Sequence, residues 1–185
     1  PLMLIAAFAE PLLQLRRWAA RGVLCWCAVG LAVAVFPTGN DPLRCTFLSV
    51  GHGCAVLIEL PDGGAMLYDA GQLHNADRTE RIVESAAWSR GITRFDGIVV
   101  SHADVDHFNA VPGIVETFPV GTVFVSPSAL DQRQPAVGAL CEAVAAAGVP
   151  LRLIGAGDRL VASDDVTIRV LGPAGNVDYG DDNAN

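Results

Sequence analysis

The sequence has no Cys-x-x-Cys pair, and its five cysteines are irregularly spaced, so neither a zinc ribbon nor a disulfide framework is indicated. Charged residues make up only 17% of the chain, and the formal net charge is −8 at pH 7. A domain that binds nucleic acid through its phosphates is usually basic. Any contact with nucleic acid would therefore run through a local basic strip or through bound cations. An acidic balance also fits a domain that collects carboxylates around a cation.

The N-terminal segment, residues 1–36, holds much of the apolar excess. Three arginines precede an uncharged stretch over residues 22–36: Arg16, Arg17 and Arg21. Counted from Trp18, with Arg21 reaching to the interface, this stretch approaches the roughly 20 residues that span a bilayer as a helix. A signal peptide or a buried helix is an alternative, but an apolar segment before the arginines does not suit a signal peptide. We expect a transmembrane helix, and the positive-inside rule then places the residues after it outside the cytoplasm.

The rest of the chain divides into a short linker and one globular domain. We assign residues 1–36 to the end of a larger transmembrane region, residues 37–42 to a linker rich in turn formers, and residues 43–185 to the domain. Strands are predicted over 43–50, 55–60, 65–69, 95–101, 120–126, 151–154 and 166–171, and helices over 77–91, from 108 to 118 and over 134–147. This order favours a layered α/β arrangement.

Four side chains of the metal-ligand type fall within six residues, between a buried strand and a helix: His102, Asp104, Asp106 and His107. Loops after such strands carry the sites of α/β folds. Two neighbouring carboxylates repel each other, and a divalent cation removes that cost. In an extended loop His102, Asp104 and Asp106 face one centre, while His107 joins Asp106 at a neighbouring ion. Imidazole with carboxylate suits zinc, manganese or iron, and two such ions form a hydrolytic site.

Two other interpretations of this loop were weighed. A calcium-binding EF-hand loop that starts at Asp104 would need Gly at its sixth position and Glu at its twelfth. Those positions hold Asn109 and Val115, so the calcium interpretation fails. A polar turn whose carboxylates cap the following helix remains open.

The pattern strand-His-x-Asp-x-Asp-His-helix resembles the signature of the metallo-β-lactamase superfamily. Residues 65–71 (Ala-Met-Leu-Tyr-Asp-Ala-Gly) look like an earlier element of that family, in which the aspartate, here Asp69, orients the metal loop. Residues 48–55 (Leu-Ser-Val-Gly-His-Gly-Cys-Ala) are similar to Leu-Asp-Val-Gly-Gln-Gly-Asp-Ala of ComEC-type competence proteins, and residues 101–107 are similar to their Ser-His-x-Asp-x-Asp-His. The resemblance implies an αββα sandwich, here partial, that binds two divalent ions, zinc or manganese.

ComEC-type proteins are multi-pass bacterial membrane channels for DNA uptake, and many end in an extracytoplasmic domain of this fold. The resemblance therefore implies a nuclease that acts on incoming single- or double-stranded DNA, with the membrane and other competence-machinery proteins as partners. Asp104 or Asp106 would hold the proton of the attacking water. Two alternatives stay open: another hydrolase of this fold, acting on an ester, lactam or thioester, and a non-catalytic domain that binds DNA or supports the channel.

Several positions depart from the family pattern. Ser49 and Cys54 replace acidic residues, and His52 replaces Gln at a position that we expect to border the cleft. The loss of those acids would weaken the surroundings of the metal ligands. No histidine follows His107, and residues 181–185 resemble the Asn-rich turn that precedes a later ligand in the family. We therefore expect a domain that is incomplete at its C-terminus.

Overall fold

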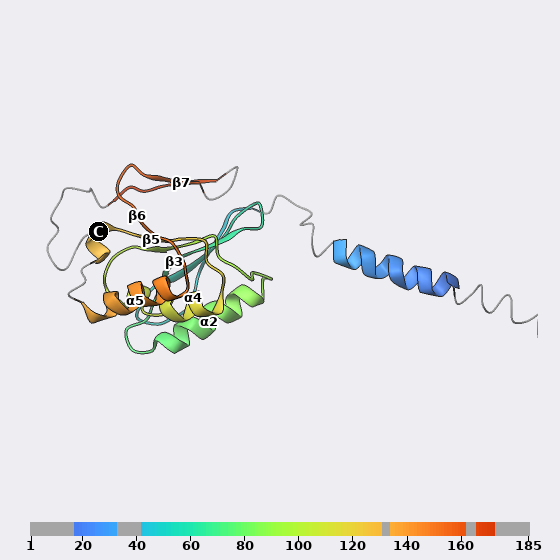
Figure 1. The fold of residues 1–185 in the computed structure, drawn as a ribbon, viewed down its shortest axis with the longest axis horizontal. Coiled ribbons are helices and arrows are strands. Elements are labelled where there is room, and N and C mark those ends of the chain that lie inside the picture. The colour runs from blue at the N-terminus through green and yellow to red at the C-terminus, as the bar shows by residue number, and fades with distance from the viewer. Residues whose placement is uncertain (1–16, 33–41, 131–133, 162–165, 173–185) are drawn as a thin grey trace, which may run out of the picture. The chain divides into compact units, whose positions relative to one another are not determined.

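The computed structural model describes residues 17–32, 42–130, 134–161 and 166–172. The chain divides into two compact units, Pro1–Gly39 and Asn40–Asn185. In the first unit a helix covers residues 17–32, drawn in blue (Figure 1). Within the described ranges, no helix combines the length and the apolar character that a bilayer crossing needs. The predicted transmembrane segment and most of the predicted linker continue into residues 33–41, which lie outside the described residues.

The second unit is built on a mixed six-stranded sheet in the order β1-β2-β3-β4-β5-β6. The first three strands are antiparallel and the last three run parallel to β3. The strands are β1 (Arg44–Phe47), β2 (Ala55–Glu59), β3 (Ala65–Ala70), β4 (Gly97–Val100), β5 (Val123–Val125) and β6 (Leu151–Leu153). The continuous apolar run of β4 is buried, as expected for a strand that is covered on both faces.

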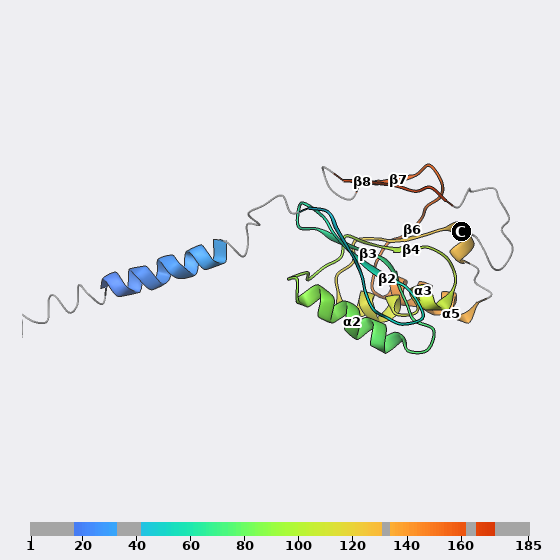
Figure 2. The ribbon, with the colours of Figure 1, turned by 180° about the vertical axis from the view of Figure 1, so that it is seen from behind.

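Helices cover one face of this sheet (Figures 1 and 2). They are α2 (Ala76–Trp88), α4 (Val111–Thr117) and α5 (Pro135–Ala146), and a 3-10 turn, η1 (Pro127–Leu130), follows β5. Asn75 starts α2, because its side-chain oxygen accepts a hydrogen bond from Arg78 N at 2.9 Å. The core lies between helices and sheet, and Val83, Ile98 and Leu140 are almost completely buried in it.

A small antiparallel sheet of β7 (Arg159–Val161) and β8 (Thr167–Arg169) lies across the opposite face of the main sheet (Figures 1 and 2). A cavity of about 260 Å³ separates the two sheets, lined by Tyr68, Val100 and Ile154 among others. The described part of the domain therefore has three layers, α/β/β. The outer helical layer of the predicted αββα sandwich is not seen in the residues that the structure describes. Strand β7 is not among the strands that the sequence predicts.

The segment after β4 corrects one sequence-based expectation. A single helix was expected after His107, but helix α3 (Val105–Phe108) already begins inside the motif, and α4 follows it. Asp104 has extended backbone angles, φ −73° and ψ 130°, and is the last extended residue of the loop. Asp106 and His107 therefore project from a helix, and the extended geometry that would have placed Asp106 beside Asp104 is absent. Pro lies in the first turn of α4, where it is tolerated.

Candidate metal centre

Asp69 lies at the carboxyl end of β3, next to the end of β4, because these two strands are parallel neighbours. Its side chain is only 1% exposed. Its φ of 56° is the only positive value of a non-glycine residue in the described part of the chain. The left-handed conformation costs an L-residue about 1–2 kcal/mol. Such strain persists only where the surrounding structure holds the residue in place, and it clusters at functional sites.

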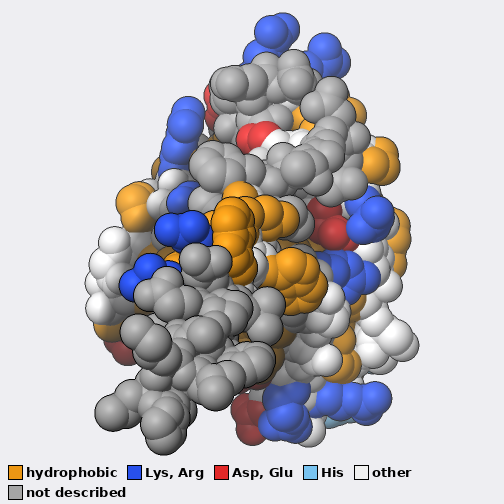
Figure 3. Space-filling view, turned by 90° about the vertical axis from the view of Figure 1, so that its right-hand side faces the viewer, with side chains coloured by type: hydrophobic (Ala, Val, Ile, Leu, Met, Phe, Trp, Pro, Cys, Tyr) orange, Lys and Arg blue, Asp and Glu red, His pale blue; other side chains and the backbone are white. Residues whose placement is uncertain are grey.

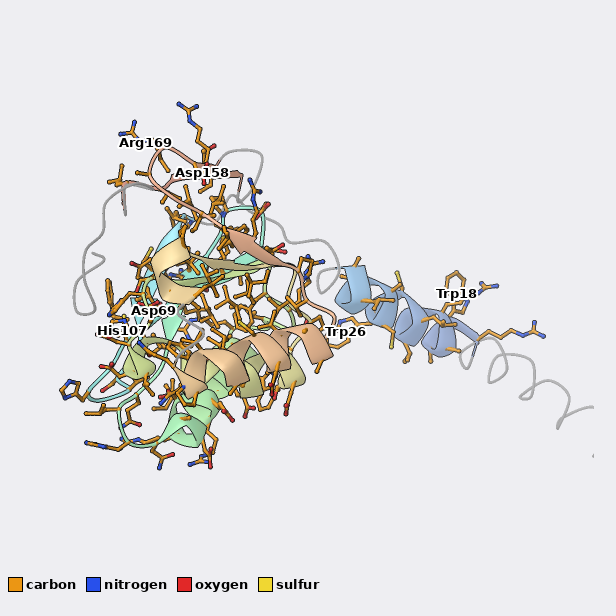
Figure 4. The ribbon with its side chains drawn as sticks, turned by 60° about the vertical axis from the view of Figure 1, so that its left-hand side comes forward. Trp18, Trp26, Asp69, His107, Asp158 and Arg169 are labelled. Atoms are coloured by element: carbon orange, nitrogen blue, oxygen red, sulfur yellow. The ribbon has the colours of Figure 1, made fainter. Side chains whose placement is uncertain are left out.

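Three hydrogen bonds hold the carboxylate of Asp69, which lies next to His107 in Figure 4. Oδ1 accepts from Ser101 N at 2.8 Å, and Oδ2 accepts from Ser101 Oγ at 2.7 Å and from His107 Nδ1 at 2.8 Å. A carboxylate can only accept, so the Nδ1 of His107 carries the proton in this assignment. In the neutral ring, Nε2 of His107 then carries a free lone pair, which a histidine needs in order to bind a metal ion.

The hydrogen bonds of Ser101 assign the tautomer of His102 in the same way. The single hydroxyl proton of Ser101 is donated to Asp69, so Oγ accepts from the Nδ1 of His102 at 2.8 Å. The Nε2 of neutral His102 is therefore also unprotonated. It faces Oδ2 of Asp104 at 3.1 Å, and the His102 and His107 rings lie with their centroids 4.0 Å apart. Asp69 and Ser101 thus present two imidazole lone pairs side by side.

The side chain of Asp104 does not cap the helix that follows it. It occupies the N-cap position of α3 but makes no side-chain hydrogen bond to that helix. Its side chain is 57% exposed and is directed at His102 instead. The capping interpretation of this carboxylate is therefore wrong.

The other predicted side chains lie at the border of this group. Asp106 Oδ2 is 3.9 Å from Nε2 of His52, which is exposed on the turn between β1 and β2. The structure therefore brings His102 together with Asp104 and with His107, whereas Asp106 has His52 as its partner.

Cys54 is the residue that sequence reasoning missed. In the described ranges, one group of three or more His, Cys, Asp or Glu side chains has donor atoms within 4.8 Å of one another, and it consists of Cys54, Asp69 and His107. Burial raises the pKa of the Cys54 thiol, and the negative charges of Asp69 and Asp106 raise it further. The sequence signal was the position of Cys54 in the stretch of residues 48–55, where the resembling proteins carry an acid.

Two glycines allow the three segments of this centre to touch. A Cβ on Gly71 would lie 2.5 Å from the carbonyl carbon of Asp106 and 2.7 Å from the backbone nitrogen of His107. A Cβ on Gly53 would lie 2.6 Å from the carbonyl oxygen of Asp106. Only glycine fits at such distances. Helix α3 is therefore packed directly on the backbone of the turn before β2 and of the segment after β3.

Asn109 adds a second connection between α3 and the segment after β3. Its Oδ1 accepts from Gln72 N at 3.0 Å, and its Nδ2 donates to Gln72 O at 2.7 Å. The backbone nitrogen of Ala110 donates to Ala70 O at 3.0 Å. The side chain of Asn109 thus links α3 to the segment after β3 through two hydrogen bonds.

Residues 48–138 match the family model described as the metallo-β-lactamase superfamily. These residues contain β2 to β5, the metal loop and Asp69, and they form a metallo-β-lactamase superfamily domain. Domains of this fold generally bind divalent cations, usually zinc, and the donors gathered around Asp69 fit such an ion. No curated protein sequence matches the chain.

Solved structures of metallo-β-lactamases are similar to part of the chain at low sequence identity. A HARLDQ-motif mutant enzyme from Cronobacter sakazakii is 20% identical over 63% of this chain and 46% of its own, with a TM-score of 0.43. SMB-1 bound to 2-mercaptoethanesulfonate is 18% identical over 66% and 46%, with a TM-score of 0.45. MEM-A1, a subclass B3 enzyme from a soil metagenome library, is 19% identical over 68% and 51%, with a TM-score of 0.44. The chain spans about half the length of these proteins.

Proposed function

We propose that this domain is a metal-dependent hydrolase that cleaves phosphodiester bonds of DNA during uptake. Its centre is built on His102, Asp104, Asp106 and His107, with Asp69 beneath them. In the assembly that we propose, the domain is extracytoplasmic and belongs to a multi-pass membrane protein that works with other competence proteins. The superfamily supports the hydrolase part of this proposal, and the residues shared with ComEC-type proteins support the DNA-uptake part.

The observation that carries the proposal is the pair formed by His102 and Asp104. In the neutral ring the network assigns the proton of His102 to Nδ1, so an unprotonated Nε2 then faces a carboxylate oxygen at 3.1 Å. Two lone pairs at this distance repel each other unless a proton or a cation lies between them. A divalent cation satisfies both groups at once and suits this mixture of imidazole and carboxylate.

Residues of the chain position the imidazoles and hold the proton of the attacking water. Asp69 and Ser101 hold the two imidazoles with Nε2 exposed, so little reorganisation is needed when an ion binds. A bound cation supplies a water of lowered pKa and polarises a phosphoryl oxygen. The exposed carboxylate of Asp104, or that of Asp106 on α3, can hold the water proton at an oxygen.

The charge of the chain limits how DNA can be bound. A net charge of −8 disfavours contact with a phosphate backbone except through cations or local arginines. Basic side chains are dispersed among apolar and acidic ones on the face shown in Figure 3. We therefore expect the bound cations to supply much of the attraction for the scissile phosphate.

A substrate panel tests this proposal against the two alternatives. The full chain is loaded with zinc or manganese and incubated with single-stranded DNA, double-stranded DNA, a β-lactam and a thioester, beside a sample that contains a chelator. We expect cleavage of DNA that the chelator abolishes and that His102→Ala lacks. Hydrolysis of the lactam or thioester alone would favour another hydrolase of this fold. DNA binding without cleavage of any substrate would favour a non-catalytic domain, and unchanged metal content in His102→Ala would refute the proposed centre.

A further inference from the structure

Cys54 is placed by its backbone rather than by the flexibility of its side chain. Its nitrogen donates to Asp106 O at 3.2 Å, and its carbonyl oxygen accepts from Gly71 N at 2.9 Å. The preceding Gly53 has a φ of 152° and has no room for a Cβ. Both backbone groups of Cys54 are thus tied to the segments that carry the centre, and its side chain is held beside them.

The thiol lies among donors that are still free to bind an ion. Its sulfur, a carboxylate oxygen of Asp69 and a ring nitrogen of His107 lie within 4.8 Å of one another. A carboxylate offers about four lone-pair sites, and the described hydrogen bonds to Asp69 occupy three of them. The Nε2 of His107 has no hydrogen-bond partner among the described residues. Because Nδ1 of His107 donates to Asp69, an ion held by both residues through these atoms would take the place of the proton in that hydrogen bond.

The other cysteines of the chain differ from Cys54 in this respect. Cys25, Cys27 and Cys45 are exposed, and Cys141 is half-buried on α5 against the hydrophobic core. Cys54 alone belongs to a group of metal-ligand side chains in the part of the chain that the structure describes. The nearby carboxylates disfavour a free thiolate at this position, and a doubly charged cation reverses that effect.

We propose that Cys54 is a thiolate ligand, together with Asp69 and His107, of a thiophilic divalent cation, zinc in preference to manganese. This inference rests on the proposed metal-dependent function and adds a donor that the predicted loop lacks. Thiolate sulfur is a soft ligand that favours zinc, whereas manganese favours oxygen. Binding replaces the thiol proton, which is released to solvent. The centre is therefore expected to discriminate between the two metals through this one side chain.

Cobalt(II) is the probe, because a cobalt–thiolate bond gives a near-ultraviolet charge-transfer band in addition to the visible bands of any bound cobalt. The full chain, Cys54→Ser, Cys54→Asp and Cys141→Ser are each titrated with cobalt, and their folding is compared by circular dichroism. We expect the charge-transfer band in the wild-type chain and in Cys141→Ser, and its loss in both Cys54 variants. Cys54→Asp keeps a donor, so its visible bands persist even where Cys54→Ser binds poorly or folds poorly.

A competition titration supplies the second readout. Cys54→Ser should lower the affinity for zinc about tenfold or more and the affinity for manganese by a smaller factor. Visible cobalt bands without a charge-transfer band in the wild-type chain would overturn the role of Cys54 but leave the proposed hydrolase centre intact. The same holds for a charge-transfer band that survives in both Cys54 variants. Absence of every cobalt band would overturn the metal centre itself, and the role of Cys54 with it.

Discussion

Asp69→Asn removes the negative charge to which Ser101 and His107 donate, and the asparagine can still adopt the left-handed backbone conformation of this position. Asparagine tolerates the left-handed region about as well as aspartate, so the φ of 56° adds no new strain. The amide keeps one accepting oxygen and turns a donor toward groups that themselves donate, namely Ser101 and the Nδ1 of His107. One buried donor therefore loses its acceptor, and the remaining bonds lose their charge.

The magnitude follows from the number of bonds. A hydrogen bond to a charged group contributes about 1.5–3 kcal/mol, whereas a neutral bond contributes about 1 kcal/mol. Two bonds that weaken by about 1 kcal/mol each, and one buried donor left unpaired at about 1–3 kcal/mol, lower the free energy of unfolding by about 3–5 kcal/mol. Where the amide donates to the Nδ1 of His107, the ring proton moves to Nε2 and blocks that nitrogen as a ligand, so zinc affinity should fall by about 10- to 100-fold.

Asp96→Asn is the matched control for this prediction. The carboxylate of Asp96 accepts from Ala65 N at 3.1 Å and pairs with Arg94 at 2.7 Å, but it is partly exposed and directly precedes β4. Its loss should cost no more than about 1 kcal/mol and leave zinc affinity unchanged. Urea unfolding in the presence of a chelator measures stability, and a competition titration measures zinc affinity. An Asp69→Asn variant that unfolds within about 1 kcal/mol of wild type, with unchanged zinc affinity, would falsify this reasoning.

Three further perturbations test separate parts of the structure. Ser101→Ala should abolish the preference of His102 for a protonated Nδ1, observable by nitrogen NMR of the ring, and Ser101→Thr should restore it; an unchanged ring signal in Ser101→Ala would contradict the assignment. Gly71→Ala should destabilise the fold by about 1–3 kcal/mol and weaken metal binding, because its Cβ meets the backbone of α3, whereas Gly138→Ala in α5 meets no atom within 4 Å and should be neutral or stabilising in thermal melts. Burial raises the pKa of Glu80, and so do acidic neighbours, so the folded state binds this proton more tightly than the unfolded state. The stability that comes from protonated Glu80 is fully present below the ordinary glutamate pKa and is lost as pH rises through the pKa of the folded state. Glu80→Gln should therefore be as stable as wild type at acidic pH and more stable at pH 7, by less than about 1 kcal/mol. Equal stability of the two proteins at pH 7 would contradict the prediction.

The framework of the domain was predictable because its elements carry periodic patterns or sharp boundaries. The buried run of β4, the amphipathic α2 and the alanine-rich α5 were all assigned from sequence within a few residues. The errors lie at element ends, where single side chains decide. Asn75 starts α2 through one hydrogen bond. In the same way, the early start of α3 at Val105 depends on local backbone geometry that a list of ligand-type residues does not contain.

The loop from His102 to His107 could be singled out from the sequence, but the residues that lie against it could not. The spacing of histidine and aspartate identified the segment, and the resemblance assigned Asp69 to it. The position of Cys54 beside Asp69 and His107 depends on contact between segments far apart in sequence, made where Gly53 and Gly71 leave no room for a side chain. A glycine in a sequence shows that close approach is allowed, but it does not name the residue that approaches. This information exists only once the strands are paired.

The choice of aspartate at position 69 argues for function over stability. Glycine would relieve the strain of the positive φ. An apolar side chain would avoid the desolvation of a buried charge, and the replacement of a whole buried polar group by apolar residues is often neutral or stabilising. Either change on its own would leave the donors of Ser101 and His107 without an acceptor, so the comparison is with a site in which all three residues are replaced. What neither can do is accept the protons of Ser101 and His107 together, and so leave Nε2 free on two adjacent imidazoles. The strain at Asp69 is therefore explained by the orientation of the two histidines, since no gain in packing at this position requires a carboxylate.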